Sequence, residues 1–195
     1  MSETEVRRAV AYAAPVILIL ISMLFAISFL IASLLGLPFS LGLPTWTRVL
    51  GGAIVVAGVA VTGWLFRYRS PANMIVSTYV TLSKLFRRTP VAEPAGRTEP
   101  LVLIGPQRYV RHPLYFSVII IVLGCALLTT YTFVLIATVI ILLWFRFVMI
   151  PFEERELCAL FGDQYLKYMD ETPMLVTFTK RKRHPNATRT NALSE

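Results

Sequence analysis

The sequence has few charged residues, cysteines or histidines, and each scarcity excludes a class of protein. Charged residues make up 15% of the 195 residues and hydrophobic residues 56%, which lies outside the usual range of soluble domains. The two cysteines and two histidines are too few for a disulfide framework, and no CxxC motif occurs. We therefore expect neither a disulfide nor a metal site.

Charge is absent from three long stretches, at residues 9–47, 49–66 and 113–145. Each stretch approaches or exceeds the roughly 18–20 apolar residues that cross a bilayer as a helix. The chain is therefore predicted to be an all-α integral membrane protein in contact with the lipid bilayer. Residues 1–8 and the run that follows also resemble a signal peptide, but the run is too long for one. We interpret it as a retained membrane helix.

The last charge-free stretch is too long for a single membrane helix. Residues 114–145 would form a helix of about 48 Å, whereas the hydrocarbon core is about 30 Å thick. Polar residues at 129–132 lie near its middle, so we expect two antiparallel helices joined there. The prediction is one membrane domain over 1–195, with about four transmembrane helices in two hairpins, at about 9–35, 48–66, 113–128 and 132–150.

The remaining segments are predicted to lie outside the bilayer. Residues 72–86 have apolar residues three and four apart and end in basic residues, which favours a helix in the membrane interface. A cytoplasmic helix is expected at about 151–169, and a disordered tail at about 180–195.

The formal net charge of +8 is concentrated next to the apolar runs and in the tail. Arg and Lys at these places set topology and contact anionic headgroups. No nucleic-acid-binding motif accompanies them, so we expect no nucleic-acid partner. Placing every Arg-rich segment on one side predicts a cell-membrane protein with both termini in the cytoplasm.

A first polar cluster lies where the third apolar run begins. Arg111, His112 and Tyr115 surround Pro113, which suits the first position of a helix because its missing N–H would be unpaired there. Polar groups at the mouth of a membrane helix usually mark a functional site. The alternative is that the arginines only set membrane topology.

A second polar cluster follows the last apolar run. Glu153, Glu154 and Glu156 lie near the start of the expected cytoplasmic helix, where the helix dipole stabilises acidic side chains. They could be no more than terminal charges on a solvated helix. Arg146 is the only charged residue between His112 and Glu153. It is expected either to reach the headgroups or to bind an anionic group of a lipid-borne acceptor.

The two clusters, in this order and separated by a hydrophobic hairpin, resemble the isoprenylcysteine carboxyl methyltransferase family, which is related to the phospholipid N-methyltransferases. The resemblance covers about residues 101–173. It rests on Leu101-Val102, Gly105, Arg111-His112-Pro113-Leu114-Tyr115, Glu153-Glu154 and the segment from Phe161-Gly162 to Tyr168. It implies an S-adenosylmethionine-dependent methyltransferase without a Rossmann domain. The cofactor would lie in a cytoplasm-facing pocket, and the acceptor would arrive from the lipid.

By position, the resemblance implies a cofactor site formed by Leu101, Val102, Gln107, Arg111, His112, Pro113, Leu114, Tyr115, Glu153 and Glu154. Glu153 would hold the ammonium group of the cofactor, and Leu101 and Val102 would line its adenosyl side. Methyl transfer from a sulfonium centre needs alignment more than proton transfer, so no catalytic acid or base is assigned. The partner would be a membrane lipid or lipophilic small molecule, either prenylcysteine carboxylate-like or a phospholipid amine.

The chain departs from the family pattern at three positions. Gln107 stands where the family often has Tyr, and Ser117 where it often has Gly. The prenylcysteine enzymes carry an Arg near the position of Met149 that meets the substrate carboxylate. Here the nearest candidate for substrate binding is Arg146, one turn earlier.

Two other functions are compatible with this pattern. An NADPH-dependent sterol-type membrane reductase shares the plan of a hairpin followed by a cytoplasmic tail, although an acidic pair suits an ammonium better than a nucleotide phosphate. A non-catalytic membrane scaffold would need neither cofactor and would tolerate changes at His112 and Glu153.

Overall fold

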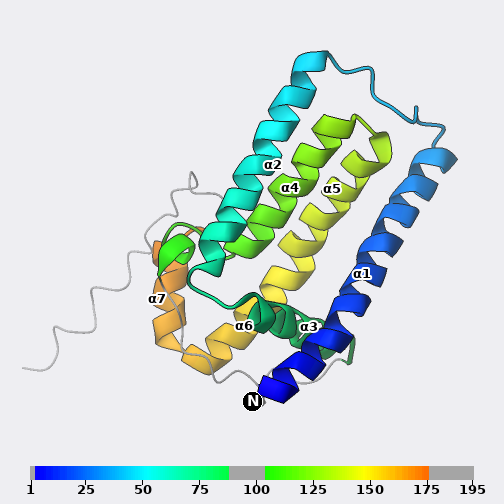
Figure 1. The fold of residues 1–195 in the computed structure, drawn as a ribbon. Coiled ribbons are helices and arrows are strands. Elements are labelled where there is room, and N and C mark those ends of the chain that lie inside the picture. Colours follow the sequence, from blue (N-terminus) through cyan, green and yellow to red (C-terminus); the bar gives the residue numbers. More distant parts are fainter. Residues whose placement is uncertain (1–2, 88–103, 176–195) are drawn as a thin grey trace, which may run out of the picture.

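The computed structural model describes residues 3–87 and 104–175, and the regular elements in these ranges are helices (Figure 1). In chain order they are α1 (Glu3–Leu34), α2 (Thr45–Phe66), α3 (Pro71–Arg87), the 3₁₀ turn η1 (Gly105–Arg108), α4 (Pro113–Thr129), α5 (Thr132–Trp144), the π-helical turn η2 (Phe145–Met149), α6 (Ile150–Phe161) and α7 (Asp163–Glu171). Leu101, Val102 and the tail expected at 180–195 lie outside the described residues.

Three helical stretches are long and apolar enough to cross a membrane, namely Ala11–Leu34, Thr45–Phe66 and the continuous run Thr132–Phe161. The apolar helix Pro113–Thr129 is shorter, at 17 residues or about 25 Å. The predicted all-α membrane protein is therefore confirmed. The turn expected at 129–132 is also present, because α4 ends and α5 begins within it.

The α4–α5 hairpin forms the centre of the bundle. α2 packs against α4, and α1 packs against α5, so the order across the bundle is α2, α4, α5, α1 (Figure 1). The two helices of the first expected hairpin therefore lie on opposite sides of the second hairpin. Residues 35–44 make this arrangement possible because they pass across the end of the central hairpin.

Glycines let α2 and α4 approach each other until their backbones touch. A Cβ atom at Gly51 would lie 2.5 Å from the backbone nitrogen of Leu128, and one at Gly124 would lie 2.8 Å from the carbonyl oxygen of Gly51. At Gly58 a Cβ atom would lie 2.5 Å from Ile121. The small residues of the second apolar run predict such a close neighbour, and α4 is that neighbour.

The loop at 35–44 is fastened to the turn between α4 and α5. Thr130 has a left-handed backbone with φ of 59°, which is unfavourable for a β-branched residue. The N–H of Leu41 donates to its carbonyl at 2.7 Å, and the hydroxyls of Ser40 and Thr130 lie 2.9 Å apart. These bonds hold the turn in place and close this end of the bundle.

The remaining short helices gather at the opposite end of the bundle, where α3 lies across it against α1 (Figure 1). The helix expected at 72–86 is present as α3. α5 continues through the π-helical turn into α6, which ends at Phe161. The next residue, Gly162, has a φ of 51°, which suits glycine. The segment expected as one helix at 151–169 is therefore divided into α6 and α7.

We predict that Gly51→Ala destabilises the protein in detergent, whereas Gly52→Ala does not. Overpacking a tight helix contact costs about 1–3 kcal/mol, and a Cβ atom at Gly52 meets only the tip of Leu128 at 3.9 Å. Both substitutions gain the same helix propensity, so the difference isolates the contact. Thermal unfolding of the two variants is the measurement. Equal unfolding temperatures would contradict the backbone contact between α2 and α4.

Candidate functional site

The segment that precedes α4 is bound to the C-terminal end of the described chain. The backbone N–H of Arg111 donates to the carbonyl of Pro173 at 2.9 Å, and the next N–H donates to the next carbonyl at 3.2 Å. The hydroxyl of Tyr168 donates to the carbonyl of Gln107 at 2.6 Å. Burial raises the pKa of Tyr168 to about 12, so this donor keeps its proton at neutral pH. α7 and the residues after it are therefore fixed against the first polar cluster.

Four ionisable side chains from the two polar clusters meet between these segments. Arg111 forms an ion pair with Glu154 at 2.8 Å and donates to the carbonyl of Met169 at 2.6 Å. The ring nitrogens of His112 lie 3.4 Å from Glu154 and 3.6 Å from Glu153. Exposure of the four side chains ranges from 4% at Arg111 to 16% at Glu153, so the charges are largely withdrawn from solvent. We call these four residues the ion cluster.

The charge state of the ion cluster depends on His112. Burial by itself lowers the pKa of His112, but contacts with Glu153 and Glu154 outweigh burial and raise that pKa above its ordinary value of 6.5. Two carboxylates face one guanidinium, so the cluster has one negative charge in excess while His112 is neutral. Protonation of His112 removes that excess.

Local structure explains why these side chains converge. Pro113 is the first residue of α4, and His112 caps the helix through its backbone without a side-chain hydrogen bond. Glu153 lies in the first turn of α6. The π-helical turn before α6 adds a residue to the helical path and so changes the direction in which the following side chains point.

A large apolar cavity lies beside the ion cluster, between α1, α3, α4 and α5, with a volume of about 580 Å³. This volume is within the range of small-molecule sites. Apart from Thr78, Tyr115 and Trp144, the residues that line it are aliphatic, Met, Phe or Pro. Such a lining suits a hydrocarbon chain.

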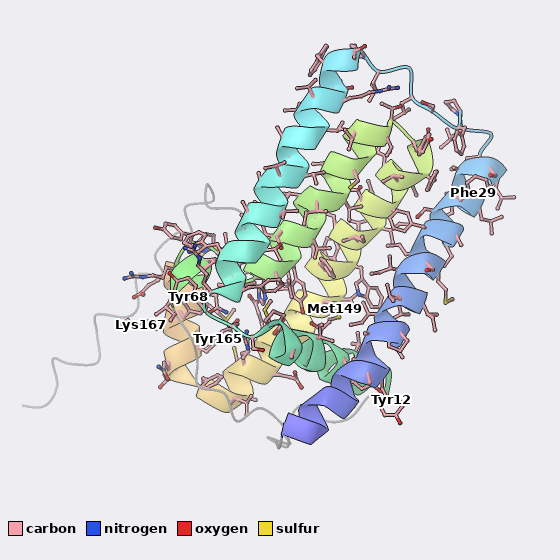
Figure 2. The ribbon with its side chains drawn as sticks, viewed as in Figure 1. Tyr12, Phe29, Tyr68, Met149, Tyr165 and Lys167 are labelled. Carbon is pink, nitrogen blue, oxygen red and sulfur yellow. The ribbon has the colours of Figure 1, made fainter. Side chains whose placement is uncertain are left out.

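Tyr115 belongs to both the cavity and the site. Its ring stacks on His112 with centroids 5.6 Å apart and lies 4.6 Å from the ring of Phe145. Tyr115, Phe145, Met149 and Leu114 all line the cavity. Met149 is only 2% exposed and lies inside the bundle at the end that carries α6 and α7 (Figure 2). The ion cluster and the apolar cavity are therefore in direct contact through Tyr115.

Arg146 belongs neither to the ion cluster nor to the lining of the cavity. Its side chain is exposed, and its guanidinium carbon is 5.4 Å from the centre of the Phe147 ring, which is 66% exposed. Arg146 is not among the residues that line the cavity. A headgroup-facing position agrees with these contacts, and a role in binding the acceptor remains a prediction.

The structure brings most of the expected cofactor residues to one end of the bundle. His112, Arg111, Glu153 and Glu154 form the ion cluster, Pro113 starts α4, and Gln107 contributes its carbonyl. Within the described residues, no group of three or more His, Cys, Asp or Glu is arranged to hold a metal ion.

Two buried tyrosines on α7 lie close to charges of the ion cluster and were not assigned to the site from the sequence. Tyr165 is 1% exposed, and burial together with the charge of Glu154 raises its pKa far above the ordinary value. Figure 2 shows it pointing into the group of short helices. The signal for them in the sequence is the segment from Phe161-Gly162 to Tyr168, which is part of the family resemblance and contains both tyrosines.

The comparisons with known proteins agree with this architecture. The family described as phospholipid methyltransferase matches residues 46–164, which is more than half of the chain and includes both polar clusters. No curated protein and no solved structure matches the chain significantly. The chain belongs to the phospholipid methyltransferase family, a family of membrane methyltransferases.

Proposed function

We propose that this protein uses S-adenosylmethionine to methylate a lipid-borne or lipophilic acceptor at the cytoplasmic face of the membrane, with both termini in the cytoplasm. The observation that carries the proposal is the position of Tyr115, which stacks on the ion cluster and also lines the apolar cavity. A charged cofactor on one side and an apolar acceptor on the other would meet at this residue. Membership of a methyltransferase family supports the same reaction.

The residues of the ion cluster fit the amino-acid part of S-adenosylmethionine. Glu153 is the more exposed of the two carboxylates and lies 3.6 Å from His112, so it can accept a hydrogen bond from an ammonium group. The Nε–H of Arg111 is buried and has no hydrogen-bond partner within the described residues. A buried donor without an acceptor is costly, and a carboxylate would satisfy it. The adenosyl side is proposed to be lined by Leu101 and Val102.

The apolar cavity fits the acceptor. Its walls carry no charged side chain among the described residues, so a hydrocarbon tail can enter while the polar head stays at the end formed by Tyr115 and Phe145. Each methylene buried from water contributes about 0.8 kcal/mol. A hydrocarbon tail that moves from the bilayer into the cavity gains much less free energy, because it was already out of water. The cavity would therefore select acceptors by the shape of the tail rather than by its hydrophobicity.

The chain contributes orientation rather than proton transfer. When bound, S-adenosylmethionine supplies a methyl group on a sulfonium sulfur; a lone pair of the acceptor forms the new bond, and the electrons of the broken bond remain on sulfur. Glu153 and Arg111 fix the cofactor, and Tyr115 and Phe145 exclude water from the point of contact. Alignment of two reactants can supply about 7–11 kcal/mol of the barrier, which makes a general base unnecessary for an acceptor that is already nucleophilic.

The direct test of this function is transfer of a labelled methyl group from S-adenosylmethionine to a total membrane lipid extract. We expect label in a lipid product whose identification defines the acceptor as a carboxylate, amine or thiol. Binding of NADPH to the purified protein in place of S-adenosylmethionine would instead favour the reductase, and binding of neither would favour a scaffold.

We predict that Glu153→Gln weakens binding of S-adenosylmethionine by about tenfold or more, because a lost charge-assisted hydrogen bond costs about 1.5–3 kcal/mol. Glu156→Gln is the matched control on the same helix and is expected to keep wild-type affinity, since Glu156 pairs with Lys84 outside the ion cluster. Titration calorimetry is the measurement. Equal affinities for Glu153→Gln and the wild type would remove Glu153 from the site.

We also predict that binding of S-adenosylmethionine strengthens as pH rises through the pKa of His112. Below that pKa the protonated ring competes for Glu153 and repels a cofactor with a net positive charge. Above it the ion cluster regains its excess negative charge. Because the pKa of His112 is raised, the midpoint of this change lies above pH 6.5, and binding releases a proton in the pH range around that midpoint.

The control for this pH dependence is His112→Asn. The α-amino group of the cofactor also titrates near pH 8, so only the part of the profile that disappears in the variant reports on His112. Calorimetry in buffers of different ionisation enthalpy measures the proton release directly. Identical pH profiles and proton release in the two proteins would contradict the role given to His112.

A further inference from the structure

Glu156 is a buried acid on α6 that the ion cluster does not use. The residue is 4% exposed, and its carboxylate lies 3.0 Å from the Nζ atom of Lys84 on α3. The two side chains are 72 residues apart in sequence. A buried carboxylate that lost its partner would be strongly unfavourable, so this ion pair fixes the distance between α3 and α6.

One face of α3 forms a wall of the apolar cavity. Met74, Ile75 and Thr78 line the cavity from this helix. Further along the same helix, Leu85 packs against the buried cluster that includes Tyr115 and Met149. This face of α3 therefore extends from the cavity to Tyr115, where the cavity meets the ion cluster. Lys84 is the neighbour of Leu85 at that end of the helix.

The two ends of α3 are held by different means. Its first residue, Pro71, follows α2 after a short turn, so the covalent chain fixes that end. At the other end, Lys84 pairs with a helix whose first turn presents Glu153. The ion pair thus connects the cavity wall to the helix that carries the acidic side chains of the ion cluster.

We propose that Lys84 and Glu156 are positioning residues for the acceptor: their ion pair holds α3 as the closing wall of the apolar cavity and so sets acceptor affinity. The inference rests on the proposed function, because the cavity is taken to bind the acceptor. It assigns neither residue to the cofactor site. Loss of the pair would loosen the wall at its Leu85 end without altering Glu153 or Arg111.

The kinetic test compares Lys84→Met, Glu156→Gln and the exchanged pair Lys84→Glu with Glu156→Lys. Each single variant is expected to raise the acceptor KM several-fold and to leave the affinity for S-adenosylmethionine unchanged. The exchanged pair is expected to recover a low KM, because the attraction is restored. Lys167→Met, which removes an exposed lysine from α7, is the control and should match the wild type.

A second measurement does not depend on methyl transfer. Vesicles that contain a phospholipid with a diazirine on its acyl chain are irradiated with the protein, and labelled peptides are identified. We expect label on the α3 peptide that contains Met74 and Thr78 in the wild type, and a clear loss of that label in Lys84→Met. Failure of every acceptor to be methylated would defeat the proposed function, whereas the labelling result would still decide whether the ion pair holds the wall.

Three outcomes would overturn the proposal. The first is wild-type acceptor KM and labelling in both single variants. The second is an equal loss of cofactor and acceptor affinity, which would indicate a general structural role. The third is an exchanged pair that folds and binds cofactor but keeps the raised KM. If the exchanged pair does not fold, a wild-type acceptor KM in either single variant would overturn the proposal.

Discussion

The buried ion pair between Arg111 and Glu154 is the interaction on which the charged end of this molecule depends. Neither charge can be left alone in a poorly solvated environment, because an unpaired buried charge costs several kcal/mol. Arg111 precedes α4 and Glu154 lies near the start of α6, so the pair holds the segments on either side of the α4–α5 hairpin against each other. The same guanidinium holds the carbonyl of Met169, which adds α7 to the group.

A boundary between polar and apolar space follows from this arrangement. The ion cluster lies at the end of the bundle, and the helices continue away from it with few polar side chains. Tyr115 stands at the boundary, because its ring stacks on His112 and the residue also lines the cavity. A methyltransferase for lipid-borne acceptors requires such a boundary, since a charged donor and an apolar tail cannot be solvated in the same compartment.

Much of the fold and of the candidate site could be predicted from the sequence, because the patterns that indicate them lie within short segments of the chain. Charge-free runs predicted the long apolar helices, polar residues at 129–132 predicted the turn, and the two polar clusters contain the four residues of the ion cluster. The separation of α1 from α2 could not be predicted. It arises because the glycines of α2 pack against α4, and the sequence does not show which helix they contact. The pairing of Lys84 with Glu156 was equally hidden, since a lysine at the end of an amphipathic helix is also typical of contact with headgroups.

Met149 bears on which acceptor the proposed function would use. It lies at the junction of cavity and cluster, at the position near which the prenylcysteine enzymes are expected to carry an arginine. A methionine there offers no partner for a carboxylate, and under the proposed function the Nε–H of Arg111 would be taken by the carboxylate of the cofactor. A carboxylate head at Met149 would therefore be desolvated without compensation, which costs far more than the same step for a neutral amine. Under the proposed function, the junction would therefore favour an acceptor whose reacting group enters uncharged.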